Sequence, residues 1–144
     1  MWSISENTFI KDNIPHYGNK YLTGNGYFGI RGTMEEYDKS GMCAINMAGI
    51  YDRVGDAWRE SVNAPNVLYT YIKVNGEKIA LPENTPFSHT QELDFYNAIH
   101  KRETVFCVPG GKVTIKAERF ASMTNQHLVG LRYSVSADFD CDIE

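Results

Sequence analysis

Several carboxylates in the sequence are close enough together to be considered for acid–base chemistry. Cleavage with inversion needs a general acid on one side of the reacting bond and, on the other side, a nucleophile that is either phosphate or a base-activated water. Glu35 and Glu36 are adjacent, so on a strand their side chains would point to opposite faces and could not flank one bond. Glu92 and Asp94 are two positions apart and could share a face, but the irregular polar stretch from 82 to 97 is expected to be a long loop. The sequence therefore predicts no catalytic residue.

Other patterns that bind metals, phosphates or cofactors are absent from the sequence or weak. The segment Gly24-Asn25-Gly26 lacks the Gly-Lys-Ser/Thr of a P-loop and does not have the spacing of a dinucleotide-binding turn. Acidic residues at 138, 140 and 142 alternate along an expected strand, which favours a solvated face over the alternative of a calcium site. The histidines show no ligand spacing; they are His16, His89, His100 and His127. We expect no metal and no cofactor.

The cysteines and the charge balance limit the compartment and the partners. The chain has 144 residues, a net charge of −4 and three cysteines, at 43, 107 and 141. An odd number of widely spaced cysteines favours reduced thiols that pack as small buried hydrophobes. The N-terminal residues do not resemble a signal peptide, so we expect a cytoplasmic protein. No long apolar run or basic cluster is present, which argues against membrane and nucleic-acid partners.

Alternation and tight turns predict antiparallel strands. Asn75-Gly76 separates the apolar runs at 68–74 and 78–81, which is typical of a type I′ hairpin. Pro109-Gly110-Gly111 separates two longer alternating runs, and the break in alternation at Arg119-Phe120 predicts a bulge or a corner. Residues 129–143 alternate throughout, as one long strand or two strands joined by a bend, and the apolar face still repeats at the end of the chain.

These strands have one apolar face each and can close a core only against a second sheet. The sequence therefore predicts an all-β antiparallel sandwich over residues 1–144 as a single domain, and the unfinished alternation suggests that it is the N-terminal part of a larger sandwich. Three aromatic residues could form a platform for a sugar ring, although core or interface packing is the favoured interpretation; they are Tyr51, Trp58 and Tyr69.

Five segments in collinear order resemble the N-terminal region of glycoside hydrolase family 65, which includes maltose, trehalose and kojibiose phosphorylases. The most specific is Leu22-Thr23-Gly24-Asn25-Gly26-Tyr27-Phe28-Gly29-Ile30-Arg31-Gly32. The others are Ala48-Gly49-Ile50-Tyr51-Asp52-Arg53, Val62-Asn63-Ala64-Pro65-Asn66, Leu93-Asp94 with Arg102, and Glu118-Arg119-Phe120-Ala121-Ser122 with the strand that follows.

The resemblance implies a galactose-mutarotase-like supersandwich about twice this long, followed by an (α/α)6 catalytic barrel that is absent from this chain. It implies a parent enzyme that transfers a glucosyl unit from an α-linked disaccharide to inorganic phosphate with inversion, the phosphate being a co-substrate. This domain alone would be inactive, would support its own catalytic domain and would take part in a homodimer.

The resemblance also raises a second interpretation of two loops. Asn25, Tyr27 and Arg31 could face the catalytic domain, although the glycine spacing of their segment better suits tight turns and close approach of strands. Asn63 and Asn66 could contact that domain or a sugar hydroxyl, although Asn beside Pro commonly caps a turn. A free-standing carbohydrate-binding module, a purely structural or oligomerisation domain, and a hydrolase as the parent enzyme remain the alternatives.

Overall fold

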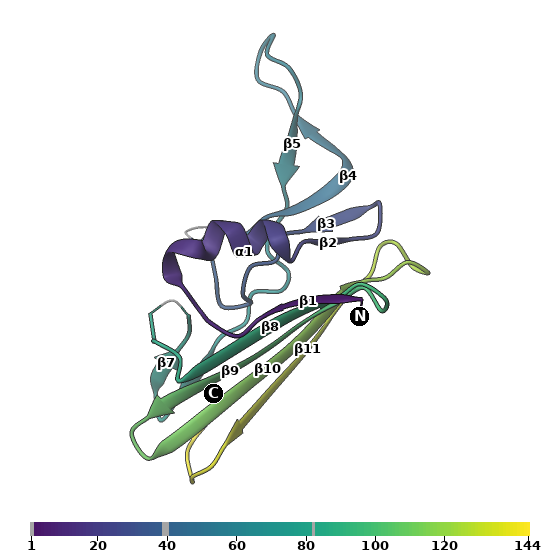
Figure 1. Ribbon diagram of the computed structural model, residues 1–144. Helices are drawn as coiled ribbons and strands as arrows, with labels where there is room; N and C mark the ends of the chain where they lie inside the picture. The colour runs from purple at the N-terminus through teal and green to yellow at the C-terminus, as the bar shows by residue number, and fades with distance from the viewer. Residues whose placement is uncertain (1, 39–40, 82) are drawn as a thin grey trace.

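The two long alternating segments around Pro109-Gly110 form the centre of the largest sheet. The computed structural model describes residues 2–38, 41–81 and 83–144. Five antiparallel strands pair in the order β1-β8-β9-β10-β11 (Figure 1). Their bounds are Ser3–Glu6 (β1), Ser88–Asp94 (β8), Ile99–Val108 (β9), Gly111–Ala121 (β10) and Val129–Ala137 (β11).

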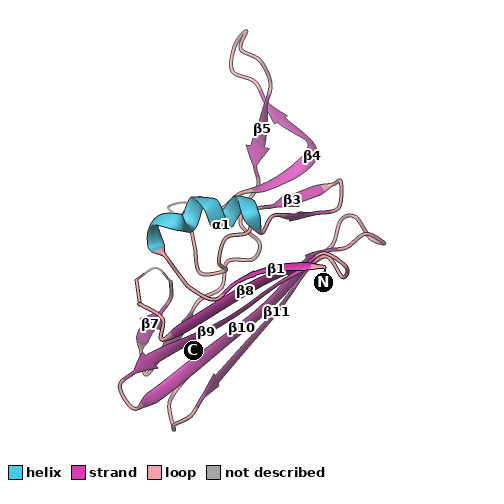
Figure 2. Cartoon of the chain, viewed as in Figure 1, coloured by secondary structure: helices cyan, strands magenta, loops and turns pink. Residues whose placement is uncertain are grey.

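Two smaller sheets and one short helix complete the described fold. A four-stranded sheet has the order β2-β3-β4-β5, and β6 and β7 form a separate hairpin. Their bounds are Thr23–Gly24 (β2), Phe28–Ile30 (β3), Ile45–Asp52 (β4), Glu60–Asn63 (β5), Ile72–Val74 (β6) and Glu77–Ile79 (β7). A 3-10 turn, η1 (Lys11–Asn13), leads into α1 (Ile14–Lys20), the α-helix drawn in cyan in Figure 2. The architecture is an all-β sandwich, as the sequence predicts.

One face of the large sheet holds the core. The β6–β7 hairpin and the segment around Met34 and Tyr37 pack on Phe106, Val113 and Ile115. A second cluster joins β3 and β4 to the far ends of β10 and β11, and a third joins α1 to β1 and β8. Figure 1 shows α1 and the four-stranded sheet on the same side of the large sheet.

The two predicted hairpins are confirmed. Ile72 pairs with Ile79 across Asn75 and Gly76, whose φ angles of 50° and 83° are those a type I′ turn requires. Val108 pairs with Gly111 across a two-residue turn in which Gly110 has a φ of 105°.

Three expectations about local structure were wrong. The stretch 82–97 is not a long loop, because β8 occupies 88–94 with His89 and Gln91 facing inward. No bulge interrupts β10 at Arg119, which pairs in register with Leu131; Arg119 is buried, and the outward Phe120 lies over Gly130 instead. The cysteines are free but not buried, since Cys107 is exposed and the other two are half-buried.

The last expected strand is shorter than either predicted form, because only the bend and not a second strand follows its first part. β11 ends at Ala137, the chain then bends, and Ile143 forms an isolated bridge with Val74. Within the described residues β11 pairs only with β10. The inward side chains of β10 are buried, whereas those opposite them on β11 are half-buried, which leaves this side of the core partly open.

Candidate functional site

The segment from Asn25 to Arg31 is fixed to its own domain by its polar side chains. Asn25 is 4% exposed, and its amide donates to the carbonyl oxygens of Ser122 (2.7 Å) and Gln126 (3.1 Å). Its Oδ1 accepts from the N–H groups of Tyr27 and Phe28, at 3.0 and 2.8 Å. Asn25 thus acts as a clasp between its own turn and the turn at 122–126, and its buried amide is fully hydrogen-bonded.

Tyr27 and Arg31 also contact other parts of this domain. The Tyr27 ring meets the His127 ring edge-on, with centroids 4.3 Å apart. The Arg31 guanidinium crosses α1 next to Gly18 and donates to the carbonyl of Pro15 at 2.8 Å. A Cβ at Gly18 would lie 2.3 Å from Arg31 Nε, so the glycine makes room for the arginine.

The two asparagines of the second loop hold the base of the β4–β5 hairpin and the neighbouring turn. Asn63 accepts from the N–H of Ile45 (2.9 Å) and donates to the carbonyl of Cys43 (3.0 Å). Asn66 accepts from the N–H of Leu68 (3.1 Å), forming an Asx turn, and donates to the carbonyl of Tyr37 at 3.1 Å. The five candidate residues do not form one site, and each has a structural partner within this domain.

A buried ionic cluster that sequence reasoning missed lies between the large sheet and the segment that covers it. Glu35 and Glu36 occupy a turn rather than a strand, and both reach the guanidinium of Arg102. Arg102 Nε lies 2.7 Å from Glu35 Oε2, and Arg119 Nη1 lies 3.3 Å from Glu35 Oε1. Thr104 accepts a further hydrogen bond from Arg102 at 3.1 Å.

The cluster is closed to solvent, which decides what it can do. The four charged side chains are at most 2% exposed, so no substrate can reach their carboxylates. Burial alone would raise the pKa of Glu35, but Arg102 and Arg119 outweigh burial and hold this pKa below its usual value. A carboxylate kept ionised by two guanidinium groups fixes the covering turn to β9 and β10; it is poorly suited to donate a proton.

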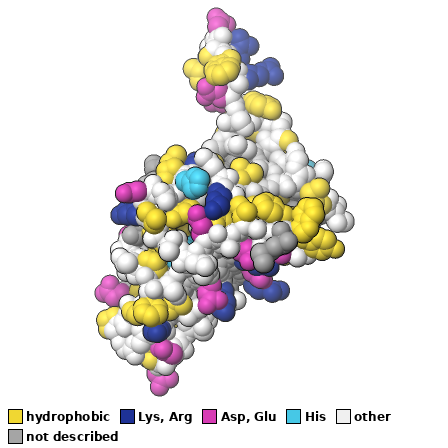
Figure 3. Space-filling model, viewed as in Figure 1, with side chains coloured by type: hydrophobic (Ala, Val, Ile, Leu, Met, Phe, Trp, Pro, Cys, Tyr) yellow, Lys and Arg dark blue, Asp and Glu magenta, His cyan; other side chains and the backbone are white. Residues whose placement is uncertain are grey.

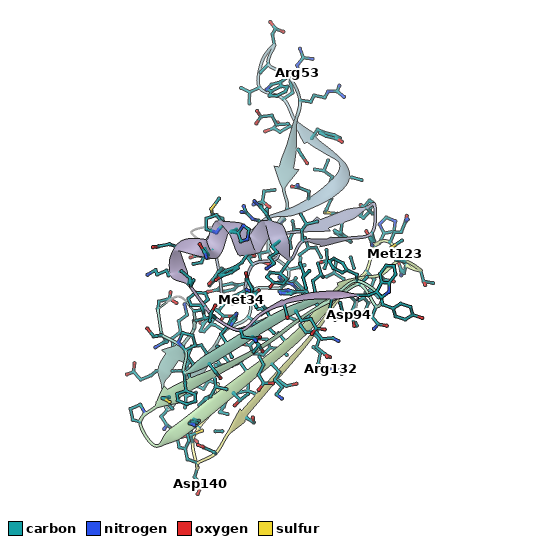
Figure 4. The ribbon with its side chains drawn as sticks, in the orientation of Figure 1. Met34, Arg53, Asp94, Met123, Arg132 and Asp140 are labelled. Carbon is teal, nitrogen blue, oxygen red and sulfur yellow. The ribbon has the colours of Figure 1, made fainter. Side chains whose placement is uncertain are left out.

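The opposite face of the large sheet is polar and carries a row of alternating charge. Glu92, Lys101, Glu118 and Arg132 are cross-strand neighbours on β8 to β11, under a shallow hollow of about 520 Å³. Lys101 Nζ lies 3.9 Å from Glu92 and 3.2 Å from Asp94, and Arg132 lies 3.2 Å from Glu118 (Arg132 and Asp94 are labelled in Figure 4). Glu92 and Asp94 therefore share a face. The charges compensate one another and leave no single-sign field for a charged ligand.

The acidic and histidine side chains of the described residues are dispersed over the domain. No group of three or more His, Cys, Asp or Glu side chains there is placed to hold a metal ion. Asp138, Asp140 and Asp142 are exposed, and Asp138 accepts from the N–H of Lys112 at 2.6 Å. None of the helices among the described residues has the length and hydropathy needed to cross a membrane.

Comparison with known proteins places these features in one family. The model of the glycosyl hydrolase family 65 N-terminal domain matches residues 4–144. The nigerose phosphorylase of Lachnoclostridium phytofermentans is 49% identical over 142 residues, which are 99% of this chain and 19% of that enzyme. The 1,2-α-glucosylglycerol phosphorylase of Bacillus selenitireducens is 30% identical over 98% of this chain and 18% of its own length.

A solved structure from the human microbiome, described provisionally as a kojibiose phosphorylase, has the same fold. It superposes with a TM-score of 0.89 at 22% sequence identity, over 99% of this chain and 20% of its own. This chain thus spans about a fifth of the length of the proteins that it matches. On the match of its residues 4–144, the chain belongs to glycosyl hydrolase family 65 and corresponds to the N-terminal domain of that family.

Proposed function

We propose that this chain is the non-catalytic N-terminal domain of an inverting phosphorylase that transfers a glucosyl unit from an α-linked disaccharide to inorganic phosphate. The observation that carries the proposal is the match over nearly the whole chain to enzymes named as phosphorylases, for nigerose, glucosylglycerol, kojibiose and maltose. The closed Glu35–Arg102–Arg119 cluster favours a non-catalytic role for the domain. Its buried carboxylate is engaged in ion pairs that hold the fold and is not available to a substrate.

The domain's task in this proposal is to support the catalytic barrel and to contribute to a homodimer. Asn25, Arg31, Asn63 and Asn66 then act by fixing the loops of the surface that faces the barrel, rather than by binding sugar themselves. The three free cysteines support a cytoplasmic setting, where thiols stay reduced. Phosphate is the co-substrate of the whole enzyme, and we propose no cofactor for this domain.

A chimera provides the direct test of the supporting role. The matching 142-residue segment of the Lachnoclostridium nigerose phosphorylase is replaced by this chain. We expect an active chimera that cleaves nigerose only when phosphate is present. A folded chimera that has lost activity would contradict the supporting role. In the natural full-length enzyme that contains this domain, cleavage of nigerose, kojibiose, maltose or trehalose without phosphate would instead indicate a hydrolase.

A stand-alone carbohydrate-binding module is the second candidate, and exposed aromatic side chains favour it. Trp58 is 80% exposed and Tyr51 is 59% exposed, so neither packs in the core, and both could stack on a sugar ring. This candidate predicts a measurable heat when nigerose or maltose is titrated into the isolated chain. Absence of heat at high millimolar sugar would exclude it and leave the supporting role.

A further inference from the structure

The β4–β5 hairpin projects from the rest of the molecule as an arm, defined here as residues 46–62. Figure 1 shows it leaving the sandwich at the end of the four-stranded sheet. Tyr51 pairs with Ser61 and Asp52 pairs with Glu60, and the register shifts between these pairs and Asn46 at the base. The contacts of its strands are mainly with each other and with β3. The arm thus extends beyond the core that its own chain provides.

The tip of the arm displays apolar side chains to solvent. Val54 is 78% exposed and Trp58 80%, and both border a hollow of about 180 Å³ together with Asp52 and Glu60. Figure 3 shows yellow side chains on the arm beside blue and magenta ones. A two-stranded hairpin is only marginally stable by itself, and an exposed apolar cluster on such an element typically marks a contact surface.

The turn at the tip is held in a defined shape by hydrogen bonds and an ion pair among its own residues. Arg53, labelled in Figure 4, donates from Nε to the carbonyl of Gly55 at 3.0 Å and lies 3.5 Å from Asp56. The Arg53 N–H donates to Asp52 Oδ1 at 2.7 Å, and Gly55 adopts a φ of 59°. Trp58 borders the hollow at the tip together with the acidic residues Asp52 and Glu60, and tryptophan is enriched among the hot-spot residues of protein–protein interfaces.

We propose that the arm docks on the catalytic part of the longer phosphorylase and seats Trp58 and Val54 in an apolar recess with a charged rim. The inference rests on the function proposed above. This chain covers 19% of the nigerose phosphorylase, so most of such an enzyme lies outside it and can supply the recess. A sugar is the poorer occupant, because a hollow of about 180 Å³ with one aromatic wall is smaller than ligand pockets of roughly 300–1,000 Å³.

Hydrogen exchange tests the docking without a substitution in the arm. In the isolated chain, amides 50–60 should exchange rapidly, because few contacts protect the arm. In the chimera with the nigerose phosphorylase, the same amides should exchange at least roughly tenfold more slowly. Equal rates in the two proteins would overturn the proposal. If the arm of the isolated chain became protected as the protein concentration rose, the proposal would be overturned in favour of a contact with a second copy of the chain. If protection required added nigerose, the proposal would be overturned in favour of a sugar site.

Matched variants identify the anchor. Trp58→Ala in the chimera should restore rapid exchange of the arm, and Trp58→Phe should keep most of the protection. Tyr96→Ala is the control, because Tyr96 is 83% exposed but lies in the β8–β9 turn. In the isolated chain Trp58→Ala should leave the unfolding midpoint unchanged. A Trp58→Ala chimera whose arm stays protected would refute the anchor.

The two proposals fail in different ways. An unmodified chimera that folds but does not cleave nigerose would count against the supporting function. An active chimera with an unprotected arm would count against the docking inference alone.

Discussion

His89 makes the stability of this domain depend on pH over a defined range. Its side chain is 2% exposed on the inward face of β8, and its Nδ1 lies 2.9 Å from Thr104 Oγ1. Its Nε2 has no hydrogen-bond partner among the described residues. Burial, together with the positive charge of Arg102, lowers the pKa of His89 from 6.5 to about 4. The folded domain therefore keeps this imidazole neutral under mildly acidic conditions.

The sign of the effect follows from proton binding. Below pH 6.5 the unfolded chain binds a proton at His89, whereas the folded chain does so only below about pH 4. The unfolded state binds more protons between these values, so the free energy of unfolding falls as the pH falls. The shift corresponds to about 3 kcal/mol in total, of which about 2 kcal/mol is lost between pH 7 and pH 5. His100 is shifted in the same direction by burial and adds to the loss in the wild type.

The assay is urea unfolding of the wild type and of His89→Gln at pH 7 and pH 5. We expect the variant to lose about 2 kcal/mol less than the wild type between these two values. His16→Gln is the control, because His16 is an exposed histidine on α1, away from the inward face of β8. Parallel losses in wild type and His89→Gln would refute the reasoning. So would ring NMR signals showing that His89 of the folded wild type is protonated at pH 5, a measurement that needs no variant.

Three further predictions concern stability and can be checked by urea unfolding at pH 7. Arg102→Ala should cost about 3–5 kcal/mol, because it leaves two buried carboxylates without their main partner, whereas Arg132→Ala in an exposed pair should cost less than about 1 kcal/mol. Gly110→Ala should destabilise clearly more than Gly26→Ala. Both glycines have a positive φ. A Cβ at Gly110 would lie 2.8 Å from a ring carbon of Phe139, whereas a Cβ at Gly26 would have no neighbour within 4 Å. Asn25→Ala should cost about 2–4 kcal/mol through the loss of its four hydrogen bonds, and a cost below about 1 kcal/mol would contradict the clasp.

The parts of the fold that sequence predicted well are those in which turn chemistry and alternation agree. Asn75-Gly76 and Pro109-Gly110 mark the turns of their hairpins, because few residues accept the positive φ angles found at Asn75, Gly76 and Gly110. β8 escaped prediction because two of its inward positions are His89 and Gln91, which hide the apolar alternation. α1 escaped because seven residues that include Pro15 and Gly18 carry little helical signal, and tertiary packing stabilises it instead.

The buried ionic cluster was missed because charged residues are normally placed outside. A signal was nevertheless present. Arg102 alternates in step with Phe106, and Arg119 continues the inward series of Val113 and Ile115. An arginine at an inward position of a strand needs a buried acidic partner, and the Glu35-Glu36 pair is the natural source. Sequence alone could not bring these residues together, since Glu35 and Arg119 are 84 positions apart.

The pairing of β1 with β8 sets an order of events during synthesis. Ser3 pairs with Asp94, about 90 positions later, so the first strand leaves the ribosome long before its partner exists. At about 5–20 residues per second, the delay is roughly 5–18 seconds. Glu35 and Glu36 are likewise synthesised before their partner Arg102, so their carboxylates stay hydrated until β9 emerges. The nascent N-terminal third therefore cannot close its core alone, and a translational pause before β9 would prolong exposure of that segment to chaperones and proteases.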